Sequence, residues 1–163
     1  MYLIRLFSSF LFSFFLSAGF TSFFVLLQNT AWNILWLRTQ NFDISFFIFF
    51  KSFLFDLNGG FSPIIFQWGF PINLYGVISI ALFFGFIIAS FLRLILPINS
   101  KLLFGITGLI SLYSIIFYTR IIFGEIVFIA SARGFIGLLV FCFIGFLGGI
   151  LFDFINKKLL KEV

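Results

Sequence analysis

The residues of this chain that could do chemistry are few, and the most suggestive ones lie close together. Arg120, Glu125 and Arg133 follow one another near the end of one apolar stretch and the start of the next. Two arginines flanking a carboxylate could hold a lipid phosphate through bidentate contacts. The same three charges could instead form an ion pair that stabilises a turn, and the sequence leaves both uses open.

Other kinds of chemistry are excluded or unsupported by the residue types present. The chain has no histidine and a single cysteine, Cys142, which excludes His-ligated haem or zinc, a His-based triad and an internal disulfide. Asp43, Asp56 and Glu125 are the remaining candidate acids or bases, and none has an identifiable partner. No phosphate-binding loop or dinucleotide fingerprint occurs. We therefore predict no catalytic residues, no metal and no cofactor.

The composition is that of a membrane protein. Of 163 residues, 63% are hydrophobic and 9% are charged, whereas about a quarter of the residues of a soluble domain are charged. The net charge of +5 suits loops that meet anionic headgroups, and no nucleic-acid partner is needed to explain it. Most of the chain is therefore expected to lie in lipid.

Four stretches have the roughly 20 apolar residues that a spanning helix needs. They are residues 6–27, 72–92, 102–124 and 134–153. The polar run Gln28–Asn29–Thr30 is expected to end the first. Residues 1–19 could alternatively be a signal peptide, but the apolar character continues beyond them, which favours an uncleaved first helix. The sequence predicts an all-α membrane protein with four transmembrane helices in one domain, residues 1–163.

The segment between the first two spans, residues 28–71, is predicted to be a long external loop. It contains all three tryptophans, which favour the headgroup level of a bilayer. Within it, residues 44–57 are rich in phenylalanine but too short to cross and are interrupted by Lys51. An interfacial or re-entrant helix is expected there. If this segment crossed the bilayer, every later loop would change sides.

The distribution of basic residues predicts the orientation of the chain. With the N-terminus inside, the inner face carries six basic residues, against four at the outer face: Arg5, Arg93, Lys101, Lys157, Lys158 and Lys161 inside, Arg38, Lys51, Arg120 and Arg133 outside. We therefore expect both termini on the inner, cytoplasmic side of a bacterial inner membrane or of an organelle membrane. Asp153 and Lys157, four residues apart on one helix, are expected to pair.

Small residues recur at helical spacing in every predicted span. Such stripes allow close packing where lipid offers no hydrophobic drive for association. The expected packing residues are Ser9, Ser13, Ser17 and Thr21 in the first span, Gly85 in the second, Gly108, Ser111 and Ser114 in the third, and Gly137, Gly145 and Gly149 in the fourth. These stripes hold a four-helix bundle together, or one of them, most readily the fourth, docks another subunit.

One region resembles a known family. The segment Ser62–Pro63–Ile64–Ile65–Phe66–Gln67–Trp68–Gly69, then Leu74–Tyr75–Gly76, and later Ala132–Arg133–Gly134–Phe135–Ile136–Gly137, resembles the N-terminal half of prolipoprotein diacylglyceryl transferase. The resemblance covers about residues 62–137. Ala132 stands where the family has a histidine and Ser114 where it has an arginine, and the family's later Gly-Arg-x-Gly-Asn-Phe motif has no counterpart. It implies a lipid-facing fold without the catalytic set and does not support transferase activity; Tyr75 and Arg133 are the residues to test.

These observations favour a small integral membrane protein that acts as a non-catalytic accessory or scaffold subunit. Its expected partners are membrane lipids and either other membrane subunits or further copies of itself. One alternative is a lipid-binding protein, or a degenerate relative of the transferase, that uses Tyr75, Arg120 and Arg133 at the outer leaflet. Another is a small transporter or channel, for which the serine-rich stripes supply the only polar path.

Overall fold

The computed structural model describes residues 2–59, 64–65, 71–122 and 129–161, and these are mainly helical. The elements are α1 (Tyr2–Thr39), α2 (Phe46–Gly59), β1 (Ile64–Ile65), β2 (Pro71–Ile72), α3 (Leu74–Ile95), α4 (Ser100–Ile122), the 3-10 helix η1 (Ala130–Ala132) and α5 (Phe135–Lys161). The two strands pair antiparallel with only two residues each. By length and composition, α1, α3, α4 and α5 can each cross a membrane. The predicted all-α membrane fold is confirmed.

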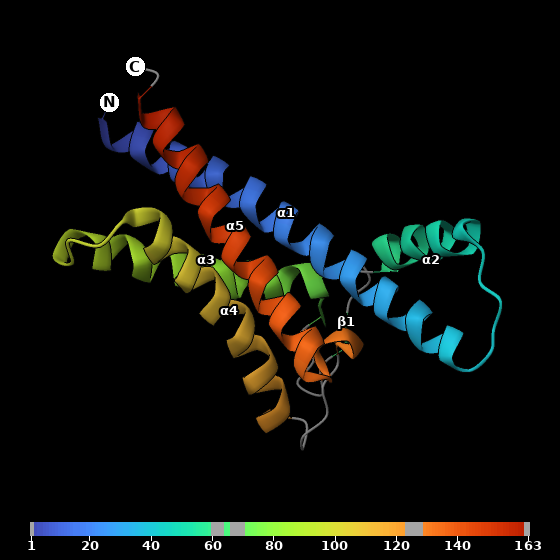
Figure 1. Ribbon diagram of the computed structural model, residues 1–163. Coiled ribbons are helices and arrows are strands. Elements are labelled where there is room, and N and C mark those ends of the chain that lie inside the picture. Colours follow the sequence, from blue (N-terminus) through green and yellow to red (C-terminus); the bar gives the residue numbers. More distant parts are fainter. Residues whose placement is uncertain (1, 60–63, 66–70, 123–128, 162–163) are drawn as a thin grey trace.

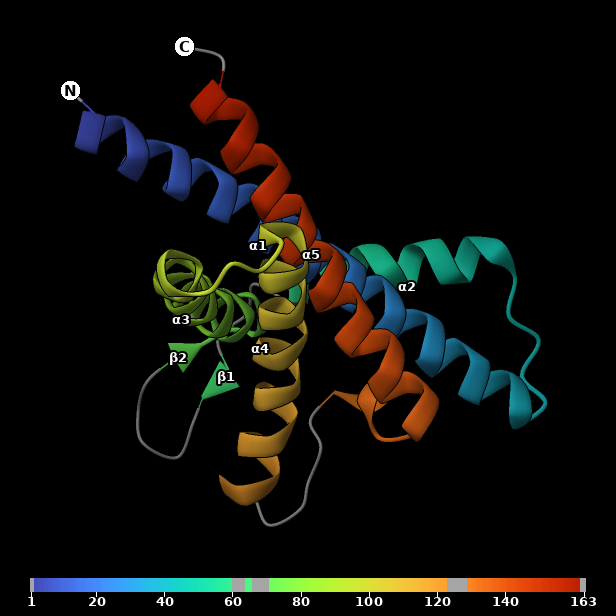
Figure 2. The ribbon, with the colours of Figure 1, turned by 60° about the vertical axis from the view of Figure 1, so that its left-hand side comes forward.

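The long helices form a crossed bundle in which α5 is central (Figure 1). α1 and α5 lie side by side in opposite directions, α4 packs across α5, and α3 packs against α4. Both chain termini lie at the same end of the bundle in both ribbon views (Figures 1 and 2). A guanidinium nitrogen of Arg5 donates to the carbonyl of Leu159 at 3.3 Å and joins the two terminal segments there. We call this end the N/C end, and the end with η1 the far end.

The first helix is much longer than predicted. It does not stop at Leu27 but continues through Gln28–Asn29–Thr30 to Thr39, so no external loop begins at residue 28. Its 38 residues span about 57 Å, whereas a hydrocarbon core is about 30 Å thick. No glycine or proline lies between Gly19 and Thr39 to interrupt it. The chain leaves the helix at Asn41, whose φ of 64° is the left-handed conformation found just past helix ends.

The other helices lie near their predicted positions and differ at the ends. α3 begins at Leu74, where the carbonyl oxygen of the Asn73 side chain accepts from the Gly76 amide at 2.6 Å and caps the helix. α4 is described to Ile122, so the predicted end at residue 124 lies outside the described residues. α5 continues beyond Asp153 to Lys161, and α2, predicted at residues 44–57, begins two residues later and runs to Gly59.

Aromatic rings fill the core at the N/C half of the bundle. Phe86 of α3 stacks on Phe152 of α5 with ring centroids 4.4 Å apart, and Phe104 of α4 lies 4.9 Å from the same ring. Phe10 of α1 meets Phe152 edge to face at 5.2 Å. All four long helices therefore meet around Phe152, and edge-to-face and offset contacts of this kind add to the packing energy.

The last ten residues of α1 and the whole of α2 form a projecting hairpin. We call Thr30–Thr39 of α1 together with α2 the arm. In Figures 1 and 2 the arm extends away from α3, α4 and α5. The Phe53 ring packs edge to face on Phe23 of α1 with centroids 5.4 Å apart. The Tyr75 hydroxyl at the start of α3 donates to the Leu57 carbonyl at 3.3 Å and ties down the other end of α2.

Candidate functional site

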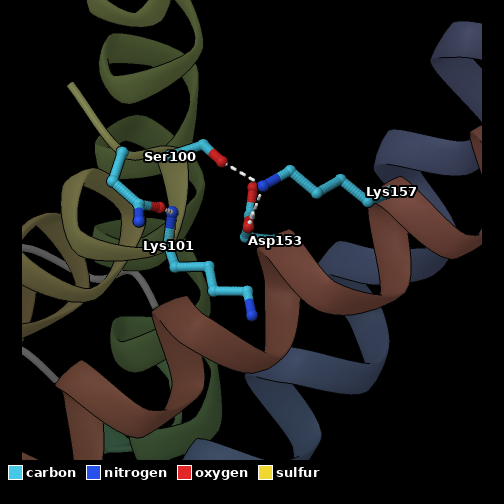
Figure 3. Close-up of polar contacts among 5 residues, drawn as sticks. Ser100, Lys101, Asp153 and Lys157 are labelled. Carbon is cyan, nitrogen blue, oxygen red and sulfur yellow. Dashed lines mark hydrogen bonds and ion pairs between the residues drawn. The ribbon is translucent and has the colours of Figure 1, made fainter.

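A buried ion pair at the N/C end is the most concentrated set of charges among the described residues. The Asp153 carboxylate is 1% exposed and lies 2.8 Å from the Lys157 ammonium on the next turn of α5. The same ammonium also donates to the Ser100 hydroxyl at the start of α4 (Figure 3). The expected pairing of Asp153 and Lys157 is thus present, and the pair also binds α4 to α5.

A lysine beside a serine hydroxyl is the arrangement used by Ser–Lys hydrolases, so its chemistry needs examining. A lysine that acts as a general base must be neutral. Here the Lys157 side-chain nitrogen donates both to the Asp153 carboxylate and to the Ser100 hydroxyl, so it acts as a donor to the serine rather than as an acceptor. In Figure 3 the Lys101 side chain extends away from this group, and the carboxamide oxygen of Asn99 accepts only from the Lys101 backbone amide, at 3.1 Å. The arrangement is suited to holding helices together rather than to activating a nucleophile.

The N-terminal turns of α1 attach to the same end of α5. The Ser9 hydroxyl donates to the side-chain oxygen of Asn156 at 2.7 Å, next to the contact between Arg5 and Leu159. Deeper in the bundle, the Ser17 hydroxyl donates to the Gly148 carbonyl at 2.6 Å. Polar contacts thus join α1, α4 and α5 along the N/C half of the bundle.

A second polar junction, at the far end, explains why α1 passes unbroken through its polar run. The Gln28 amide donates to the Gly137 carbonyl at 2.7 Å, and the Asn29 side-chain oxygen accepts from the Ser131 amide at 3.3 Å. The Thr30 hydroxyl donates to the Asp56 carboxylate at 2.5 Å and so ties α2 to α1. Each residue of the run has a partner on another element, so the polar side chains need no exit from the helix.

A groove with a volume of about 670 Å³ runs between α3 and α4. Its walls are mainly aliphatic and aromatic, and its polar residues are hydroxyl-bearing and all on α4: Thr107, Ser111, Ser114, Tyr118 and Thr119. Three of these hydroxyls donate to carbonyls of their own helix at 2.8 Å: Thr107 to Leu103, Ser114 to Ile110 and Thr119 to Ile115. The groove therefore presents a largely apolar surface.

The predicted lipid-binding residues lie on three separate elements. Tyr75 is in the first turn of α3, Arg120 is in the last turn of α4, and Arg133 follows η1. Both arginines are exposed. Glu125, the expected acidic partner, lies outside the described residues. The three-charge group therefore stays a prediction.

Most of the predicted packing residues lie at contacts between elements, whereas Ser114 lines the groove between α3 and α4 and its hydroxyl bonds within α4. A Cβ at Gly145 would come within 2.5 Å of the Gly108 carbonyl, and one at Gly149 would overlap the Phe104 carbonyl. A Cβ at Gly85 would overlap the Ser111 hydroxyl, and one at Gly137 would overlap the Ser131 carbonyl. Ser9, Ser13, Ser17 and Thr21 are all buried, and among the described residues the Ser13 hydroxyl has no hydrogen-bond partner. The first span's stripe is thus packed, mainly against α5.

Two features of the structure were not predicted: the continuation of α1 beyond residue 27 and the contact between Ser100 and Lys157. Only the first has a signal in the sequence. The continuation of α1 had a signal, because Ala31 to Leu37 contains no helix breaker and keeps apolar residues at helical intervals. The contact between Ser100 and Lys157 had none, since it depends on how α4 crosses α5.

Comparison with known proteins gives no relative for this chain. No family model, no curated protein and no solved structure matches it. Its helices show the length and composition of a small integral membrane protein.

Proposed function

We propose that the protein is a non-catalytic accessory or scaffold subunit that docks onto another membrane protein through its arm. The observation that carries the proposal is the apolar surface of the arm. Its outward side chains include Leu35 at 56% exposed, Trp36 at 60%, Phe46 at 79% and Phe47 at 74%. Large apolar side chains exposed outside hydrocarbon are typical of interaction sites.

The position of the arm separates this surface from the general lipid-facing surface. Gln28 contacts Gly137 close to the start of α5, so this level is one limit of the apolar bundle. Trp36 lies eight residues, or about 12 Å, further along α1. In this proposal Trp36 lies beyond the hydrocarbon, and an apolar surface on a partner covers it.

The test compares apolar truncations on the arm with equally exposed ones elsewhere. Wild type in mild detergent should migrate on native gels as a complex, and the double variant Trp36→Ala, Phe46→Ala should release it. The control variant Phe91→Ala, Ile122→Ala removes side chains that are 66% and 67% exposed and should retain it. A wild-type protein that is a monodisperse monomer with no co-purifying chain would contradict the proposal.

A second candidate function is lipid binding at the far end through Tyr75, Arg120 and Arg133. The exposure of both arginines supports it, as does the partial resemblance to the transferase family. Native mass spectrometry should then show an anionic phospholipid that is lost in Arg133→Ala. Unchanged retention would count against this function.

We further propose that the N/C end faces the cytoplasm, in a bacterial inner membrane or an organelle membrane. The exposed Arg93 and Lys101, together with Lys157, lie towards that end. With Cys142 replaced by alanine, a cysteine at position 45 should react with an impermeant reagent from outside, and one at position 158 should not. The reverse pattern would invert the orientation.

A further inference from the structure

The groove between α3 and α4 has the shape and lining of a site for a hydrocarbon chain. Its volume of about 670 Å³ falls within the usual range of ligand pockets. Ile80, Phe84 and Ile88 form one wall, and Ile110 and Ile115 form much of the other. α3 and α4 approach closely at Gly85 and Ser111, and this contact closes the back of the groove.

Three of the five hydroxyls in the groove are already satisfied within α4 and do not call for a polar ligand. Thr107, Ser114 and Thr119 each donate to a carbonyl one turn back in α4. These bonds satisfy the donors within the helix, so the side chains can face hydrocarbon at little cost. A lipid chain suits this lining better than water, an ion or a sugar.

The groove is long enough to hold an acyl chain that enters from the N/C end and spans one leaflet. Its α3 wall runs from Val77 to Leu92, which is about 22 Å of helix. One leaflet contributes about half of the 30 Å hydrocarbon core, or about 15 Å. A chain entering at Leu92 would therefore reach the level of Leu82, past the closest approach of the two helices.

Two exposed cations lie in the turns next to the N/C end of the groove. Arg93 follows Leu92 directly, Lys101 lies in the first turn of α4 across the connecting turn, and both are exposed. Within the described part of the chain, the single ion pair is the one between Asp153 and Lys157, so neither Arg93 nor Lys101 is neutralised by a carboxylate. Neither residue lines the groove itself, but two exposed cations in the turns next to its N/C end complement a lipid that carries a phosphate and a net negative charge.

We propose that this groove binds an anionic phospholipid from the leaflet at the N/C end. One acyl chain lies between α3 and α4, and Arg93 and Lys101 hold the phosphate. The site is separate from the far-end arginines and from the arm, so it can fail or succeed independently of the function proposed above.

The experiment measures lipid retention by the full-length protein. The purified, delipidated protein is exposed to equal amounts of phosphatidylglycerol and phosphatidylcholine with matched chains, and retained lipid is counted by native mass spectrometry. We expect about one phosphatidylglycerol per chain, preferred about tenfold over phosphatidylcholine. Arg93→Gln with Lys101→Gln should lower the preference towards one, whereas the control Lys51→Gln, which removes an exposed cation on α2, should leave it unchanged.

Two further measurements separate the chain from the headgroup. Dihexanoyl phosphatidylglycerol, whose chains are too short to fill the groove, should compete at least tenfold less well, and inorganic phosphate should not compete. The proposal is overturned if wild type shows no preference, if Lys51→Gln loses the preference to the same extent, or if the short-chain lipid or phosphate competes equally. A second copy or another chain that crosslinks through a cysteine at Ser114 would also overturn it.

Discussion

The contact between α4 and α5 allows a stability prediction with an internal control. A Cβ at Gly149 would overlap the backbone carbonyl of Phe104, which cannot rotate away as a side chain can. Gly19, in the middle of α1, has nothing within 4 Å of the corresponding position. Alanine improves intrinsic helix propensity by about 1 kcal/mol at either site. The difference between Gly149→Ala and Gly19→Ala therefore isolates the steric cost of forcing the helices apart.

That cost is expected to be about 1–3 kcal/mol, the usual penalty for overpacking. It corresponds to roughly a 5- to 150-fold change in the folding equilibrium. The assay is reversible unfolding in mixed micelles, followed by circular dichroism and by maleimide labelling of Cys142. This thiol is 8% exposed in α5 and should react when α5 separates from its neighbours. If Gly149→Ala is as stable as Gly19→Ala, the close approach of Gly149 in α5 to the Phe104 carbonyl in α4 is contradicted.

Two further predictions concern the polar contacts. Lys157→Met should destabilise the fold by about 1–3 kcal/mol and by more than Asp153→Asn, because it leaves a buried carboxylate without its cation; the order of melting temperatures in detergent measures this, and the opposite order would contradict it. Thr30→Val removes the hydroxyl that donates to Asp56 and should speed hydrogen exchange of the α2 amides about tenfold, for a loss of about 1.5 kcal/mol. Thr119→Val, whose hydroxyl bonds only to its own helix, is the control; equal effects of the two would show that the arm is not held by Thr30.

The sequence was most informative where composition and period decide the structure. Four apolar stretches gave the four long helices, and small residues at helical spacing gave their close contacts, because both follow from the physics of helices in lipid. The prediction that the first helix ends at Gln28–Asn29–Thr30 was wrong, because polar residues are compatible with a helix whenever other elements offer hydrogen-bond partners. Such partners are far away in sequence. The groove and the contact between Ser100 and Lys157 were likewise invisible, because both depend on how helices cross.

The continuity of α1 has a mechanical consequence. From Arg5 to Trp36 the helix is one rod of about 46 Å without proline, anchored at one end by Arg5 and Ser9 and in its middle by Ser17. No hinge loop interrupts α1, so a tilt of the arm also tilts the part of the helix at the N/C end. A protein that binds the arm and changes its tilt would therefore shift the terminal segments of the chain. One continuous helix connects the two.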